Sequence, residues 1–154
     1  MTTTAQDRHS LIRTDWTETE VRELYQQPFN DLLFEAHQIH RRFFPPNQIQ
    51  VSTLCSIKTG TCPEDCAYCP QSVRYNTGLE SEDLVSIEEV VQQARAARAA
   101  GATRFCMGAA YRSPKQKQLD VIKEMVRKVS DLGLETCATL GMLTSDKAQQ
   151  LKSA

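Results

Sequence analysis

After residue 47 the sequence alternates three times between a short apolar segment and a longer segment with helical spacing of its apolar residues. The short segments, at 48–57, 102–107 and 135–140, contain the β-branched residues that strands favour. Strands that alternate with helices pair in parallel, because each helix carries the chain back across the sheet. The sequence therefore predicts an α/β fold of barrel or doubly wound type.

The helices of this pattern have typical start and stop signals. The segment 86–89 has the spacing of a capping box, 113–114 reads as a second helix start, and a last helix begins near Ser145. Gly101 and Gly133 follow as stops, the small residues at 108–110 predict a loop, and a second loop is expected at 141–143. The expected buried stripes are Ile87, Val90, Val91, Ala94 and Ala97 on the first helix, and Leu119, Ile122, Met125, Val126 and Val129 on the second.

The part before residue 47 predicts helices without strands. Thr17 and Glu20 have capping-box spacing for a short helix that stops before Pro28, and a second helix covers 29–43 before a proline pair. We expect two parts: a polar tail with a helical extension at 1–46, and a core at 47–154. His37 and His40 could face one metal, but the prediction is of two solvated or hydrogen-bonded histidines, because no third ligand lies nearby.

Three cysteines follow the first predicted strand with the spacing C-x3-C-x2-C, at Cys62, Cys66 and Cys69. Three thiolates can bind three irons of a 4Fe-4S cluster and leave the fourth iron without a protein ligand. Two other classes remain open: an electron carrier, which ordinarily supplies four cysteines to each cluster, and a structural zinc module built on Cys66 and Cys69.

Composition and charge bear on the cellular compartment of the protein and on its classes of partner. The formal net charge is -1, and no basic run suggests a nucleic acid partner. No apolar run is long enough to span a bilayer, and the first residues lack the apolar core of a secretory signal. We therefore expect a cytoplasmic protein whose six cysteines stay reduced, so that the clustered ones serve metal or redox chemistry.

The segment 52–78, which contains S-I-K-T-G ahead of C-P-E-D-C-A-Y-C-P-Q-S, closely resembles the biotin synthase family of radical S-adenosylmethionine enzymes. The resemblance extends back to 31–36 and forward through T-R-F-C-M-G-A-A at 103–110 to C-A-T-L-G at 137–141. It implies an N-terminal extension and the first three βα units of a (β/α)8 TIM-type barrel. Members of the family are longer, so we expect the barrel to continue beyond Ala154 and this portion to be inactive by itself.

The resemblance also implies cofactors and residue roles. Cys62, Cys66 and Cys69 would hold a 4Fe-4S cluster whose open iron binds S-adenosylmethionine. Cys106 and Cys137 would bind a 2Fe-2S cluster, the sulfur source, with ligands from later strands. The positions implied to surround these groups are Tyr68, Gly108 and Ala109 for S-adenosylmethionine and Arg104, which alternation puts on the face of Cys106, for the second cluster. We expect Cys55 to pack within its strand and not to bind a cluster.

The implied reaction is the insertion of sulfur into dethiobiotin to give biotin, started by a 5'-deoxyadenosyl radical. The family further implies a flavodoxin-type electron donor and a homodimer. Another radical S-adenosylmethionine enzyme and a non-catalytic iron-sulfur electron-transfer protein are the alternatives.

Overall fold

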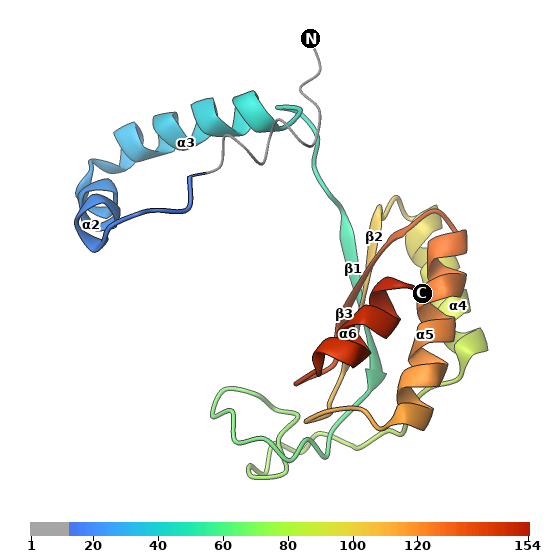
Figure 1. The fold of residues 1–154 in the computed structure, drawn as a ribbon. Coiled ribbons are helices and arrows are strands. Elements are labelled where there is room, and N and C mark those ends of the chain that lie inside the picture. Colours follow the sequence, from blue (N-terminus) through green and yellow to red (C-terminus); the bar gives the residue numbers. More distant parts are fainter. Residues whose placement is uncertain (1–12) are drawn as a thin grey trace. The chain divides into compact units, whose positions relative to one another are not determined.

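The computed structural model describes residues 13–154, and the chain divides after Ile49 into two compact units (Figure 1). The described part of the first unit contains two helices, α2 (Glu18–Gln26) and α3 (Phe29–Phe43). The second unit alternates strands and helices in the order β1 (Ser52–Lys58), α4 (Ile87–Ala99), β2 (Arg104–Ala109), α5 (Gln116–Asp131), β3 (Glu135–Thr139) and α6 (Ser145–Lys152). No helix within 13–154 is long and apolar enough to cross a membrane.

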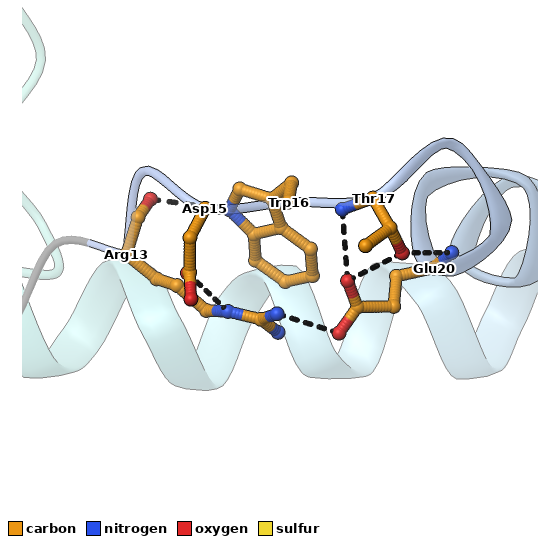
Figure 2. Close-up of polar contacts among 5 residues, drawn as sticks. All are labelled: Arg13, Asp15, Trp16, Thr17 and Glu20. Atoms are coloured by element: carbon orange, nitrogen blue, oxygen red, sulfur yellow. Dashed lines mark hydrogen bonds and ion pairs between the residues drawn. The ribbon is translucent and has the colours of Figure 1, made fainter.

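The capping box predicted at Thr17 is confirmed at the start of α2. Figure 2 shows the Glu20 carboxylate accepting from the Thr17 N–H at 2.9 Å and from the Thr17 hydroxyl at 2.7 Å, while that hydroxyl accepts from the Glu20 N–H. Arg13 donates to Glu20 at 2.6 Å and to Asp15 at 2.7 Å, and its guanidinium lies over the Trp16 ring. The Thr17 hydroxyl thus satisfies the Glu20 N–H, which has no partner inside the helix, and the Glu20 carboxylate satisfies the N–H of the N-cap residue.

Helix α3 has the predicted bounds. It begins after Pro28, whose ring suits a helix start, and ends at Phe43, with Phe44 as its C-cap just before Pro45. None of its residues is buried, and its apolar residues Leu33 and Ile39 are 51% and 59% exposed.

The sheet is parallel with strand order β1-β2-β3, which confirms the predicted α/β fold. Helices α4 and α5 lie side by side over one face, where α4 contacts β1 and α5 contacts β3 (Figure 1). The core lies between these helices and the sheet, and every apolar position predicted to be buried on α5 is buried. The largest buried side chains of this core are Ile57, Phe105, Met107, Ile122, Met125, Leu140, Val90 and Val129.

Several element ends differ from the prediction. Strand β1 begins at Ser52 and not at residue 48, because its register with β2 starts at Arg104 and earlier residues have no partner strand. Helix α5 begins at Gln116 with Lys115 as its N-cap, later than the predicted start at 113–114. Strand β3 ends at Thr139, one residue early.

The prediction of a loop at 108–110 is wrong for its first two residues. Gly108 and Ala109 belong to β2, where they pair with Ser56 and Lys58 of β1. The register shifts between Ser56 and Lys58, so one extra residue of β1 is accommodated there. Small residues alone could not reveal this, because pairing with a distant strand decides where a strand ends.

Candidate metal centre

The three clustered cysteines lie in the long irregular segment between β1 and α4, at the carboxyl end of β1. Cys66 is exposed, Cys62 and Cys69 are half-buried, and all three are free thiols. The Cys62 N–H donates to Gln71 O and the Val73 N–H donates to Cys62 O, both at 2.9 Å. These bonds close the cysteine segment, defined here as 62–73, into a loop fixed at its base.

The turn that leads into this loop is held by a buried lysine. Gly60 and Thr61 both have positive φ, at 73° and 53°, a conformation that costs energy for threonine. Lys58 is 8% exposed, and its ammonium donates to Gly60 O and, at 2.6 Å, to the Thr61 hydroxyl. The same ammonium lies 5.6 Å from the centre of the Tyr111 ring. Lys58 thus stabilises the strained entry to the loop with contacts that a solvated lysine would not make.

The segment after the third cysteine returns to brace the loop. Ser72, which is 5% exposed, donates its hydroxyl to Glu64 O at 2.5 Å, and the Gly60 N–H donates to the Gln71 side chain. Tyr75 donates to the Asp65 carboxylate at 2.7 Å, and this bond raises the pKa of Tyr75, so its hydroxyl remains a donor.

Within 13–154, no three side chains of cysteine, histidine, aspartate or glutamate gather closely enough to hold a metal ion. The fit of a cluster therefore rests on donor chemistry. Three free thiols within eight residues of one loop match the thiolate ligands of a 4Fe-4S cluster, and no disulfide occupies them. His37 and His40 also lack a third ligand, and His40 stacks on Phe44.

A second pair of cysteines lies on the sheet. Cys106 of β2 and Cys137 of β3 are direct register partners. Phe105 and Met107 are buried against the helices, so strand alternation puts Cys106 on the opposite face of the sheet. Both thiols are free and half-buried. Two adjacent thiols of this kind suit two ligand positions of a 2Fe-2S cluster.

Arg104 shares this face with Cys106, as predicted from alternation. It forms an ion pair with Glu135 at 2.6 Å, and Gln50 donates to the other oxygen of the same carboxylate at 2.6 Å. The Arg104 Nε is buried without a hydrogen-bond partner among the described residues. The guanidinium is thus held beside the two thiols with its buried Nε donor unpaired.

Burial is the main cause that raises the pKa of the Cys106 thiol. The hydrogen bond and charge of Cys137 raise it further, whereas the charge of Arg104 lowers it. The hydrogen bond from Arg104 lowers the pKa of Glu135 and in turn raises the pKa of Arg104. Cys55, in contrast, is 3% exposed on the helix-covered face, which agrees with its predicted packing role.

The positions expected near S-adenosylmethionine lie around the same end of the sheet. Tyr68 is 92% exposed in the cysteine segment, with no packing partner that would explain an aromatic side chain there. A Cβ added to Gly108 would meet only ordinary contacts, at 4.0 Å from Cys55 O and Leu54, so packing within the chain does not require glycine. Sequence reasoning missed Lys58, Gln71, Ser72, Tyr75 and Arg112, whose roles depend on contacts across the loop.

The structure is thus of the α/β class, with a parallel sheet and three free thiols in the loop after its first strand, and thiols are the ligands that iron-sulfur clusters use. Residues 56–154 match the family model described as Radical SAM superfamily. The chain belongs to the radical SAM superfamily, a class that works with S-adenosylmethionine and a 4Fe-4S cluster.

Similar proteins include three bacterial biotin synthases. The chain is 61% identical to that of Saccharophagus degradans over 94% of its own length, 59% identical to that of Cellvibrio japonicus over 93%, and 63% identical to that of Alkalilimnicola ehrlichii over 92%. It covers 41%, 40% and 43% of these relatives, so the chain spans about two fifths of their length.

Proposed function

We propose that this chain is part of a biotin synthase, a radical S-adenosylmethionine enzyme that inserts sulfur into dethiobiotin to form biotin. Identities of 59% to 63% to biotin synthases over more than nine tenths of the chain support this function. The observation that carries it is the loop with three free thiols at the carboxyl end of β1, where α/β barrels place their chemistry. The second unit would supply the first three βα units of the (β/α)8 barrel, and 1–46 the extension before it.

Cys62, Cys66 and Cys69 would hold the 4Fe-4S cluster. When bound, this cluster supplies the electron that breaks a carbon-sulfur bond of S-adenosylmethionine. The exposed ring of Tyr68 offers a surface for the adenine, and the small residues Gly108 and Ala109 leave room for the cosubstrate to approach the end of β2.

Cys106 and Cys137 would bind the 2Fe-2S cluster that serves as sulfur source, with the remaining ligands from the rest of the full-length protein. Their direct register and common face support this role. Arg104 would bring positive charge and a free Nε donor to the cluster, and Glu135 would hold the guanidinium in place. A cytoplasmic homodimer with a flavodoxin-type electron donor completes the proposal.

The test uses the full-length protein, reconstituted with iron and sulfide without oxygen. We expect a brown protein whose reduced cluster changes its electron paramagnetic resonance spectrum when S-adenosylmethionine is added, and which converts dethiobiotin to biotin. Cys62→Ala should lose this signal. Cys55→Ala is the matched control, because Cys55 is buried in the core and should leave the cluster intact.

Other outcomes point to the other classes. A cluster that ignores S-adenosylmethionine would indicate an electron carrier, and a colourless protein would argue against any iron-sulfur function. Cleavage of S-adenosylmethionine without biotin formation would indicate a different radical S-adenosylmethionine enzyme.

A further inference from the structure

The two carboxylates between the first and second cysteines are both bound by side chains from outside that span. Asp65 accepts from the Tyr75 hydroxyl at 2.7 Å, and Glu64 forms an ion pair with Arg112 at 2.7 Å. No other carboxylate lies between Cys62 and Cys69. Both acidic side chains adjacent to the thiols are therefore occupied.

These two contacts are not needed to close the loop. Its base is fixed by main-chain bonds between Cys62 and residues Gln71 and Val73, and by the buried Ser72 hydroxyl on Glu64 O. Tyr75 and Arg112 instead contact the carboxylate groups of Asp65 and Glu64, which the bonds at the base of the loop do not involve.

Arg112 is itself held in place from a third loop. Its carbonyl accepts from the Met142 N–H at 2.7 Å, in the segment between β3 and α6. A Cβ added at Gly141 would lie 2.5 Å from the same carbonyl oxygen, so the two segments are in close contact. The guanidinium that binds Glu64 thus projects from a main chain that is fixed.

The ligand preferences of iron suggest why the two carboxylates are held by Tyr75 and Arg112. Three thiolates leave one iron of a 4Fe-4S cluster free, and carboxylate oxygen is a good ligand for iron. Glu64 and Asp65 are the acidic residues next to the cysteines, so either could occupy the iron that S-adenosylmethionine has to chelate. Resting on the proposed function, we propose that Tyr75 and Arg112 are positioning residues that keep Asp65 and Glu64 engaged and so leave the fourth iron open.

The experiment uses the full-length protein with its cluster reconstituted anaerobically. It compares Tyr75→Phe, Asp65→Asn and the double variant by iron content, by the electron paramagnetic resonance spectrum without S-adenosylmethionine, and by the dissociation constant of S-adenosylmethionine. Tyr75→Phe should keep its iron, alter the spectrum and weaken binding about five- to thirtyfold, the factor for a contact of ordinary strength. Adding Asp65→Asn should restore binding and spectrum, because a neutral amide is a poor ligand for iron.

The ion pair between Arg112 and Glu64 gives an independent test. Arg112→Gln should weaken S-adenosylmethionine binding less than Tyr75→Phe does, because the Arg112 side chain is 61% exposed and its ion pair is screened by water. Glu64→Gln should restore the binding. Tyr25→Phe is the control, since Tyr25 is 85% exposed in α2 and makes no side-chain hydrogen bond within the described residues.

Three results would overturn the inference while leaving the proposed function intact: unchanged affinity in Tyr75→Phe, an Asp65→Asn variant as impaired as Tyr75→Phe, or iron lost in Tyr75→Phe that Asp65→Asn does not restore. Each would mean that the contacts only shape the loop. A wild-type protein that forms no cluster, or whose cluster ignores S-adenosylmethionine, would reject the proposed function and the inference together.

Discussion

Replacing Gly141 with alanine tests how tightly the loops at the carboxyl edge of the sheet are joined. Gly141 has φ of 78°, and a Cβ there would lie 2.2 Å from Tyr111 O and 2.5 Å from Arg112 O. Both neighbours are backbone atoms, so they cannot move aside as a flexible side chain would. Gly133 offers a matched control, because its φ is 77° and a Cβ there would meet nothing within 4 Å.

The magnitudes follow from this difference. Both substitutions force an L-residue into the left-handed region, which costs about 1–2 kcal/mol. At Gly141 the two segments must also separate, which breaks the hydrogen bond from Met142 N to Arg112 O and costs about 1 kcal/mol more. Overpacking between the segments adds about 1–3 kcal/mol. We therefore expect Gly141→Ala to lose about 2–4 kcal/mol more stability than Gly133→Ala.

Urea unfolding of the full-length protein, followed by circular dichroism, measures the difference. With a slope of about 2 kcal/mol per molar urea, the midpoints of the two variants should differ by about 1–2 M. Equal midpoints would refute the close contact between the 141–142 and 111–112 segments. They would also remove the anchor assigned to the Arg112 main chain.

Further predictions concern the core, the N-terminal cap and the second cysteine pair. Phe105→Ala should destabilise the protein by about 3–5 kcal/mol in the same urea assay, because Phe105 is fully buried, and Arg95→Ala, on the exposed side of α4, by less than about 0.5 kcal/mol. Hydrogen bonds from Thr17 lower the pKa of Glu20 to about 2. The stabilisation of α2 by the Glu20 carboxylate should therefore be complete above the ordinary pKa of 4.5 and lost as the pH falls through about 2. An NMR titration in which Thr17→Ala leaves the pKa of Glu20 at about 2 would contradict the role given to Thr17. Cys106→Ala should lose the absorbance of the 2Fe-2S cluster and retain the resonance signal of the 4Fe-4S cluster, and a variant that keeps both would exclude Cys106 as a ligand.

Local patterns were enough for most of the fold. Helix caps at Thr17 and Ser86 act within four residues, and the apolar stripe of α5 depends only on helical period, so both are visible in a single sequence. The ends of the strands were harder to predict from the sequence. Gly108 and Ala109 have little strand propensity, and they belong to β2 because Ser56 and Lys58 of the neighbouring strand pair with them.

In the candidate site, too, some features can be predicted from the sequence and others cannot. The spacing of Cys62, Cys66 and Cys69 is a local signal that names a metal chemistry without any structure. The partners of Glu64 and Asp65 give no such signal, because Arg112 lies 48 residues away and Tyr75 ten. Nothing in the spacing of these residues indicates that their side chains meet.

By itself, then, the sequence determined the alternation of strands and helices and the three-thiol motif, since both depend on residues close together in the chain. Only the tertiary structure decided that Cys106 and Cys137 are direct neighbours and that the carboxylates of the cysteine segment are bound by Tyr75 and Arg112. The physical reason is that strand register and side-chain contacts across loops arise from long-range packing, which fixes geometry that no local propensity contains.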